Sequence, residues 1–206
     1  MARNLAEVLP GPFAARPDGR RERSRSSRGK IIDAYMLLVE GGEYAPTATR
    51  VAEAAGVGLR SVFRHFDDME KLYREACDQL VARVMPIVFE ELAGNNWKAR
   101  ILSLAERRAR IFTLVMPYRI FGSLKLHDSP QIFAYHKGLY EIESTMIEAE
   151  VPASVKADPL VLASLKAMLS FDTWRYMRQE LDLSVEDVTA VVKQTLTATM
   201  RDLPED

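Results

Sequence analysis

The sequence predicts an all-α protein, and three observations support this fold class. Apolar residues recur three and four positions apart along most of the 206-residue chain, which is the spacing of one helix face. No segment alternates β-branched and polar residues over the length of a strand. Capping residues precede several of the apolar repeats, and Gly or Pro follows or interrupts them, as expected at helix ends.

The first predicted helix ends at Gly41 and Gly42. Its apolar stripe consists of Ile31, Ala34, Tyr35 and Leu38. This stripe should pack over the segment that follows it.

Residues 47–66 predict two short helices joined by a tight turn. Thr47 can cap the first helix, because its hydroxyl accepts a hydrogen bond from an unpaired backbone N–H. Gly56 lies where that helix stops and adopts a left-handed conformation without strain. The second helix begins near Gly58 and keeps Val62 inward. This is the layout of a helix-turn-helix, whose second helix lies in the major groove of DNA.

The outward side of the second helix supplies candidate DNA contacts. Its side chains are Leu59, Arg60, Ser61, Phe63, Arg64 and His65. Arg suits bidentate contact with guanine, whereas Ser and His suit phosphate oxygens. We expect base contacts from Leu59, Arg60, Ser61 and Arg64, with Thr49 as a further candidate. Thr47 and His65 are expected to contact the DNA backbone.

Residues 28–75 resemble the DNA-binding domain of the tetracycline-repressor (TetR) family of bacterial transcription regulators. The matching residues are Gly42, Thr47, Val51, Ala52, Ala55, Gly56, Val57, Ser61, Val62, Phe63, His65, Phe66 and Leu72. Arg28, Gly58 and Phe63 are further expected DNA-contacting positions. The resemblance also implies a second domain, residues 76–206, that binds a small effector and forms a homodimer.

Three positions depart from the family pattern. The family usually has Tyr where this chain has Phe63, so a phenolic hydrogen bond to phosphate is missing. It often has Lys at the position of Met69 and Ser at the position of Gly58. Positive charge for the DNA backbone must therefore come from elsewhere in the chain.

The N-terminal segment is a candidate source of that charge. Residues 1–30 hold eight basic residues against three acidic ones, a net charge of +5, whereas residues 31–75 and 76–206 each carry −3. Residues 1–27 lack apolar periodicity and are expected to be a disordered arm. We expect residues 20–30 to lie along the duplex. The alternative is a solvated tail that aids solubility.

Five further helices are predicted downstream. They begin at Asp68, Trp97, Ile132, Asp158 and Ser184 and end near Val84, Met116, Ala149, Gln179 and Met200. Pro86 is expected to kink or end the first of these helices, and Pro117 to break the second. In TetR-like proteins the last two helices form a four-helix dimer interface, and this pattern is similar. The alternative is a purely intramolecular bundle.

Large apolar side chains between about residues 112 and 177 predict an effector pocket, or else only a well-filled core. The predicted lining is Phe112, Met116, Tyr118, Phe121, Phe133, Tyr140, Met146, Met168, Phe171 and Trp174. Such a lining favours a hydrophobic or aromatic effector. Arg119 or His136 could neutralise an acidic group on it, although we expect both at the surface.

Other classes of protein are less consistent with the sequence. No phosphate-binding loop or nucleophile elbow is present, so neither a cofactor nor a catalytic site is expected. His127, Asp128, His136 and Glu141 lack the spacing of a metal site. The chain has no apolar run of about 18 residues and no secretory signal, and Cys77 has no cysteine partner, which suits a cytoplasmic protein.

The sequence therefore predicts a homodimeric transcription regulator, most simply a repressor, that binds a palindromic operator and is released by its effector. The alternatives are a helical protein-interaction scaffold and a small-molecule-binding protein without sequence-specific DNA binding.

Overall fold

The computed structural model describes residues 19–125 and 129–205, and these residues form helices and connecting loops without a strand. The all-α prediction is confirmed. The helices are α1 (Gly19–Glu40), α2 (Ala48–Ala55), α3 (Leu59–His65), α4 (Met69–Val88), α5 (Trp97–Lys125), α6 (Pro130–Glu150), α7 (Ala153–Lys156), α8 (Pro159–Met168), α9 (Phe171–Gln179) and α10 (Val185–Met200).

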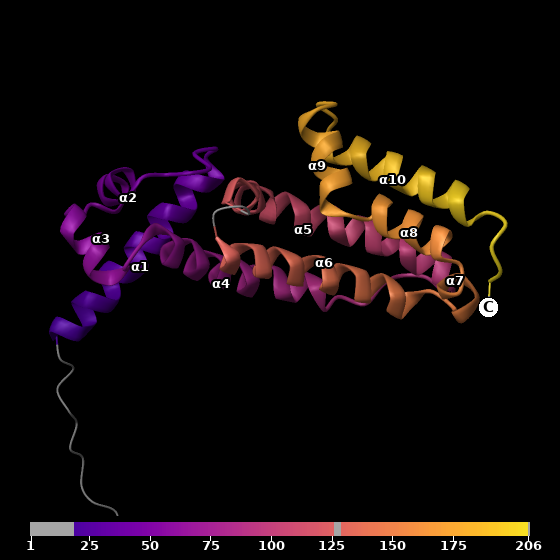
Figure 1. Ribbon diagram of the computed structural model, residues 1–206, viewed down its shortest axis with the longest axis horizontal. Helices are drawn as coiled ribbons and strands as arrows, with labels where there is room; N and C mark the ends of the chain where they lie inside the picture. The colour runs from indigo at the N-terminus through magenta and orange to yellow at the C-terminus, as the bar shows by residue number, and fades with distance from the viewer. Residues whose placement is uncertain (1–18, 126–128, 206) are drawn as a thin grey trace, which may run out of the picture.

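The molecule is elongated, with α1, α2 and α3 at one end and a helical bundle at the other (Figure 1). Helix α4 runs from the first part into the second, and it crosses the expected boundary at residue 75 without interruption. One hydrophobic core is formed by helices α1, α2, α3 and α4 together with Tyr118 and Phe121 of α5. A second core fills the bundle. No helix of the described segments is both long and apolar enough to cross a membrane.

Helix α1 begins earlier than the sequence indicated. Residues 19–27 were expected to belong to a disordered arm, but they form the first part of this helix. The prediction was wrong for these residues because the packed stripe from Ile31 to Val39 supplies a helix nucleus. Arg, Glu and Lys are good helix formers and extend that nucleus at little cost. Residues 1–18 of the expected arm lie outside the described residues.

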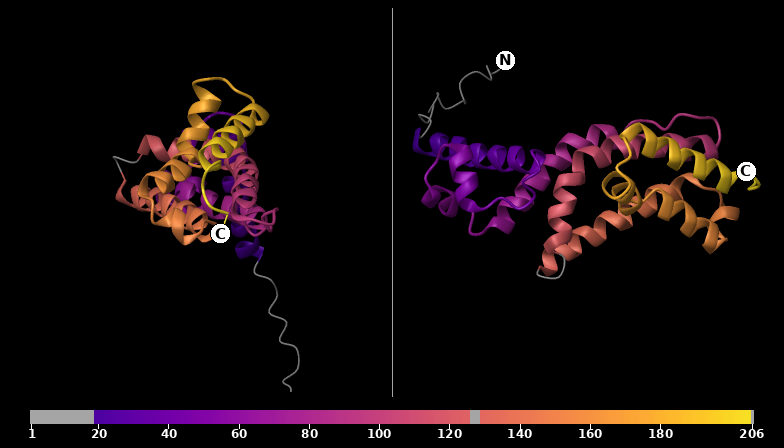
Figure 2. Two further views of the ribbon diagram at one scale, coloured as in Figure 1. Left: turned by 90° about the vertical axis from the view of Figure 1, so that its right-hand side faces the viewer. Right: turned by 90° about the horizontal axis from the view of Figure 1, so that it is seen from above.

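Helix α5 continues through Pro117, where a break was expected. A proline in a helix removes one backbone hydrogen bond and bends the helix, but tertiary packing can hold both halves. Here Phe112 lies buried before the proline, and Tyr118 and Phe121 lie buried after it. Figure 2 shows that α5 changes direction on its way to α6.

The predicted helix from Asp158 to Gln179 is two helices, α8 and α9. The hydroxyl of Ser170 accepts a hydrogen bond from the Thr173 backbone N–H at 3.2 Å and so starts α9 anew. The buried guanidinium of Arg108 donates to the Leu169 carbonyl at the break. The sequence also gave no indication of the one-turn helix α7, whereas α10 begins after Ser184 as predicted.

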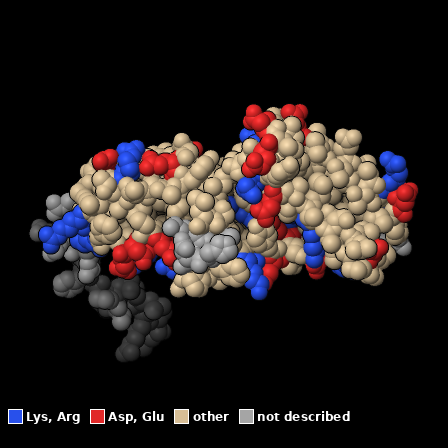
Figure 3. Space-filling view, turned by 45° about the horizontal axis from the view of Figure 1, so that its top comes forward, with Lys and Arg blue, Asp and Glu red and all other residues tan. Residues whose placement is uncertain are grey.

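The face over the C-terminal helices carries few charged side chains (Figure 3). On α8 the exposed residues include Leu160, Ala163 and Ala167, and on α10 they include Ala190 and Val191. Helices α8 and α10 also pack against each other. Their outward sides therefore form one surface with few charged side chains, which we call the α8–α10 face.

Candidate nucleic-acid interface and ligand cavity

The bent helix pair at residues 47–66 forms as predicted. Thr47 accepts a hydrogen bond from the Arg50 backbone N–H at 3.3 Å and caps α2. Gly56 ends α2 with a φ of +64°, which a residue with a side chain adopts only with strain. The Val57 N–H then reaches back to the Ala52 carbonyl at 3.0 Å. Buried Val62 fixes α3 against this turn.

Helix α3 presents both apolar and basic side chains to solvent. Leu59 is 42% exposed and Phe63 is 50% exposed. Arg60 and Arg64 are exposed as well, and neither forms a salt bridge within the described parts of the chain. Both guanidiniums are therefore available to an outside partner. Thr49 and Gly58 are also exposed, whereas Ser61 is half-buried.

Arg28, one of the expected DNA-contacting residues, forms contacts within the protein. Its Nη1 donates to the His65 carbonyl at 2.8 Å, and its Nη2 pairs with Glu75. The guanidinium also lies over the Phe66 ring, 4.6 Å from the centroid. These contacts hold α1 against the end of α3 and the start of α4. We therefore assign Arg28 to the support of the helix pair.

His65 is less suited to phosphate contact than the sequence suggested. Its Nε2 is buried and has no hydrogen-bond partner in the described segments. Burial, together with the positive charges of Arg64 and Arg28, lowers the pKa of His65. The imidazole is therefore mainly neutral near pH 7 and adds no positive charge to the exposed side of α3.

A cavity of about 270 Å³ lies between α4, α5 and α6. Three of the ten predicted residues line it, namely Phe112, Tyr118 and Met146. Helix α4 supplies a further part of the wall through Leu80 and Val84, which were not predicted because the predicted region began only at residue 112.

The other seven predicted lining residues lie elsewhere. Phe171 and Trp174 pack around Phe112 and fill the core of the bundle. Phe121 contacts Tyr73 in the core beneath α1, with 4.6 Å between the ring centroids. Phe133 and Tyr140 are exposed, and Met116 and Met168 are partly buried against the second core. Aromatic content alone did not distinguish core residues from cavity residues.

Buried charge surrounds one part of this cavity. Arg107, Arg108 and Arg119 belong to its wall together with Glu143. Burial lowers the pKa of Arg108 to about 10. Arg119 and His136 were expected at the surface, but both are buried. The sequence could not show this, because both residues lie on helices whose inward faces are set by the bend at Pro117 and by packing against α4 and α9.

A hydrogen-bond chain joins the cavity wall to the helix-turn-helix part of the molecule. The Tyr118 hydroxyl donates to Glu40 Oε1 at 2.9 Å, at the end of α1. Arg83 of α4 pairs with the same oxygen at 2.9 Å. The Tyr73 hydroxyl donates to the Tyr118 carbonyl at 3.2 Å. Tyr118 therefore links the cavity wall to both α1 and α4.

The described residues contain no group of three or more His, Cys, Asp and Glu side chains that could hold a metal ion. Cys77 is buried in the cavity wall, and burial raises the pKa of its thiol to about 12. That thiol therefore stays protonated and packs as a small apolar group.

A bent helix pair with an outward row of basic and apolar side chains is the arrangement of a helix-turn-helix. Residues 31–76 match the family model described as bacterial regulatory proteins, tetR family. The match covers the helix-turn-helix part of the chain, which therefore resembles the DNA-binding domain of this family of transcription regulators.

Two solved structures resemble the chain. A transcriptional regulator from Rhodococcus sp. Rha1 matches over 86% of this chain and 96% of its own, with a TM-score of 0.59 and 14% identity. A TetR transcriptional regulator from Rhodococcus sp. RHA1 matches over 87% of this chain and 99% of its own, with a TM-score of 0.48 and 14% identity. No curated protein sequence matches the chain.

Proposed function

We propose that the protein is a homodimeric repressor that binds a palindromic operator through α3 and leaves it when a small, apolar effector occupies the cavity. The observation that carries this proposal is the outward row on α3, where Arg60 and Arg64 are free of internal ion pairs within the described residues. The cytoplasm is the proposed place of action, because the operator is chromosomal DNA.

The exposed side of α3 suits the major groove. Arg60 and Arg64 donate bidentate hydrogen bonds to guanine edges, and Leu59 and Phe63 contact thymine methyl groups. The remaining predicted contacts, Thr47, Thr49, Gly58 and Ser61, lie at the two helix starts or beside α3 and orient the DNA backbone. The basic residues between positions 20 and 30 neutralise further phosphates from the start of α1.

Dimerisation uses the α8–α10 face. This face carries few charged side chains, and it exposes Leu160, whose side chain is 78% accessible, together with Val191. Exposed apolar area of this kind marks an interaction surface. A twofold axis here places two copies of α3 on one duplex, where they read half-sites about 34–36 Å apart.

Effector release is a population shift between two spacings of the α3 helices. An effector that prefers the spacing incompatible with the operator lowers the affinity for DNA, and DNA lowers the affinity for the effector by the same factor. A coupling of about 1–3 kcal/mol is typical of such systems. The contacts from Tyr118 and Arg83 to Glu40 carry the shift from the cavity to α1 and α4.

The experiment is selection of bound duplexes from a random library, followed by footprinting and by affinity measurements over a salt series. We expect a protected palindrome, with affinity that falls steeply as salt rises. Equal binding to all duplexes, or no binding to any, contradicts the proposal. The second result favours a small-molecule-binding protein without sequence-specific DNA binding.

A further inference from the structure

We propose that the effector is an organic acid, with one carboxylate that docks on Arg119 and an apolar body that fills the cavity between α4, α5 and α6. This inference rests on the proposed function, because it names the ligand class of the same cavity.

The wall around the cavity holds more positive than negative charge. Arg107 lies near two acidic residues, Glu90 and Glu150. Arg108 and Arg119 have only one carboxylate between them in the cavity wall, that of Glu143. Buried charges are stable only when they are paired, so a ligand that brings one negative charge completes this set.

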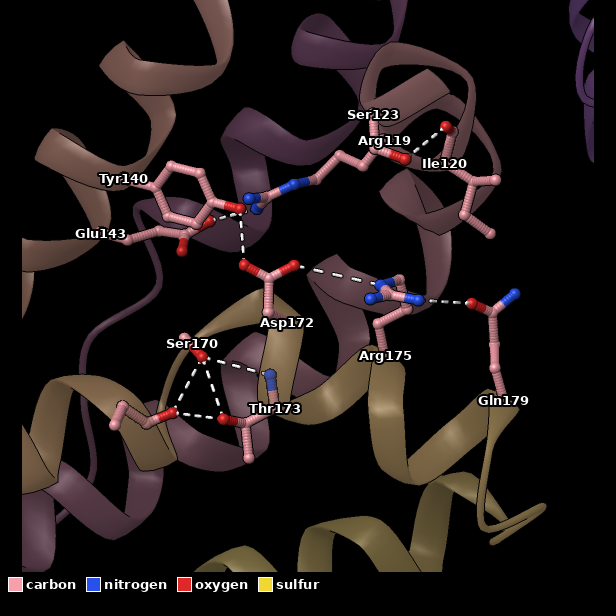
Figure 4. A network of polar contacts seen from close by, with 11 residues as sticks. Arg119, Ile120, Ser123, Tyr140, Glu143, Ser170, Asp172, Thr173, Arg175 and Gln179 are labelled. Carbon is pink, nitrogen blue, oxygen red and sulfur yellow. Dashed lines mark hydrogen bonds and ion pairs between the residues drawn. The ribbon is translucent and has the colours of Figure 1, made fainter. Parts of the chain in front are cut away.

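Asp172 is a further carboxylate near Arg119, but it contacts other side chains. Asp172 accepts a hydrogen bond from the Tyr140 hydroxyl at 2.7 Å and lies 3.9 Å from Arg175 Nε. It is an exposed residue at the start of α9 and is not part of the cavity wall. Figure 4 shows Asp172 between Tyr140 and Arg175, while Arg119 extends toward Glu143.

Arg119 retains hydrogen-bonding capacity that the protein does not use. The residue is 5% exposed, and its Nη1 pairs with Glu143. Its Nε and Nη2 are buried without a partner in the described segments. Arg108 differs, because its two terminal nitrogens donate to the carbonyls of Leu169 and Glu143. Arg119 is therefore the guanidinium that can accept a ligand.

The two unpaired nitrogens suit a carboxylate. In a guanidinium, Nε and one Nη present parallel N–H groups on one edge, and a carboxylate accepts both. The guanidinium plane is held by the ring of Phe171, 4.0 Å from its centroid, and by that of Tyr140 at 5.1 Å. Arginine is thus oriented before the ligand arrives, which reduces the entropy lost on binding.

The approach to Arg119 runs through an adaptable part of the wall. Both nitrogens are buried and Arg119 belongs to the cavity wall, so a carboxylate that docks on them must displace a neighbouring side chain. Met146 lies in the same wall on α6, one turn from Glu143, and its unbranched thioether chain repacks easily.

The rest of the cavity selects an apolar body. Side chains from three helices line it, including Leu80, Val84, Leu104, Ile111 and Leu139. Its volume of about 270 Å³ lies at the lower end of ligand pockets and suits a short alkyl chain or a single ring. Glu143 disfavours a ligand with a second negative charge.

The test is calorimetric titration of the full chain with hexanoate, octanoate and 3-phenylpropionate, each compared with its primary amide. The acid and the amide have nearly the same shape, so their affinity ratio reports the charge. We expect at least one acid to bind about tenfold or more tightly than its amide, because a hydrogen bond from Arg119 to a charged carboxylate is stronger than one to a neutral amide oxygen.

The test variant carries Arg119→Gln and Glu143→Gln together, so that both buried charges are removed. Arg175→Gln, outside the cavity, is the control. Thermal unfolding checks that each variant folds. The double variant should lose the preference for the acid, and the control should keep it. The inference is overturned if no acid binds, if the amides bind as tightly, or if the double variant retains the preference. The duplex selection decides the proposed function independently of these outcomes.

Discussion

At the scale of single residues, the contact between Gly122 and His136 shows how closely α5 and α6 approach. A Cβ at Gly122 would overlap His136 Nε2 and would lie 2.7 Å from the Tyr73 hydroxyl oxygen. Gly138 is also helical, but a Cβ there would meet no atom within 4 Å. Glycine is therefore needed for packing at one of these positions and not at the other.

The first prediction compares these two glycines. Gly122→Ala should lower the free energy of unfolding by about 1–3 kcal/mol, because the added methyl group overpacks a filled contact. Gly138→Ala should raise it by roughly 0.5–1 kcal/mol, because alanine is the better helix former. Urea denaturation measures both changes. Equal effects at the two positions would show that α5 and α6 are not in close contact here.

The second prediction concerns pH. Burial is the main cause that lowers the pKa of His136 below its usual value of 6.5, and Arg119 lowers it further while Asp172 opposes this. Below about pH 6.5 the unfolded chain therefore binds a proton that the folded chain does not. Stability should be fully present above that pH and should fall as the pH drops toward 5.

His136→Gln removes this group and should reduce the loss of stability between pH 7 and 5. Some loss remains, because the pKa of His65 is lowered as well. Urea denaturation at several pH values gives the slope. An unchanged slope in the variant would mean that His136 titrates as it does in the unfolded chain.

At the scale of elements, helix α5 contacts both parts of the molecule. Its bend at Pro117 places Tyr118 toward α1 and the next residue, Arg119, toward the cavity and α9. One helix turn thus contacts both the end of α1 and the proposed ligand. We regard the Tyr118–Glu40 hydrogen bond as the main connection between them.

The third prediction is a double-mutant cycle on this connection. Tyr118→Phe and Glu40→Gln should each destabilise the fold, and the two changes together should cost less than their sum. We expect a coupling energy of about 1 kcal/mol, which is ordinary for a hydrogen bond to a charged group that is partly solvated. Tyr176→Phe, at an exposed position on α9, is the control. Strict additivity would contradict a direct bond.

The sequence predicted those elements whose signals are local. Thr47, Gly56 and Asp68 mark helix ends through interactions within a few residues, and the structure shows each in its expected role. Two of the errors in helix boundaries, at Pro117 and Ser170, arose where distant packing outweighed a local signal. Packing of Tyr118 and Phe121 kept α5 continuous, and a cap by Ser170 with a bond from Arg108 divided a strongly apolar stretch.

The site was predicted unevenly for the same reason. The helical spacing of residues 59–65 predicts that Arg60 and Arg64 lie on the exposed side of the helix. Both side chains are exposed in the structure. The internal bonds of Arg28 depend on Glu75, 47 residues away, and no pattern in the sequence indicates that pairing. The cavity depends on how three helices diverge, so only Phe112, Tyr118 and Met146 were placed correctly.

At the scale of the whole molecule, the distribution of charge and apolar surface separates two functions along the long axis. Arg60 and Arg64 are exposed on α3 at one end, and the α8–α10 face at the other end carries few charged side chains (Figure 3). This arrangement suits a dimer that is joined by one end and holds DNA with the other.

The fourth prediction tests that dimer. Val191→Glu places a charge on the α8–α10 face and should convert a dimer into monomers, because a buried unpaired carboxylate is strongly unfavourable in an interface. Leu37→Glu adds the same charge at an exposed apolar position on α1 and should leave the assembly unchanged. Analytical ultracentrifugation measures the mass. A wild-type monomer, or a dimeric Val191→Glu variant, would contradict the proposed interface.

The central claim is that α3 reads DNA sequence, and the most direct measurement is the affinity of Arg60→Ala for the selected operator and for a scrambled duplex. The account predicts a loss of about 1–3 kcal/mol on the operator, with little change on the scrambled duplex. Arg201→Ala, at an exposed position beyond α10, should alter neither affinity. Operator affinity that is unchanged, or that falls equally on both duplexes, would contradict base recognition by α3.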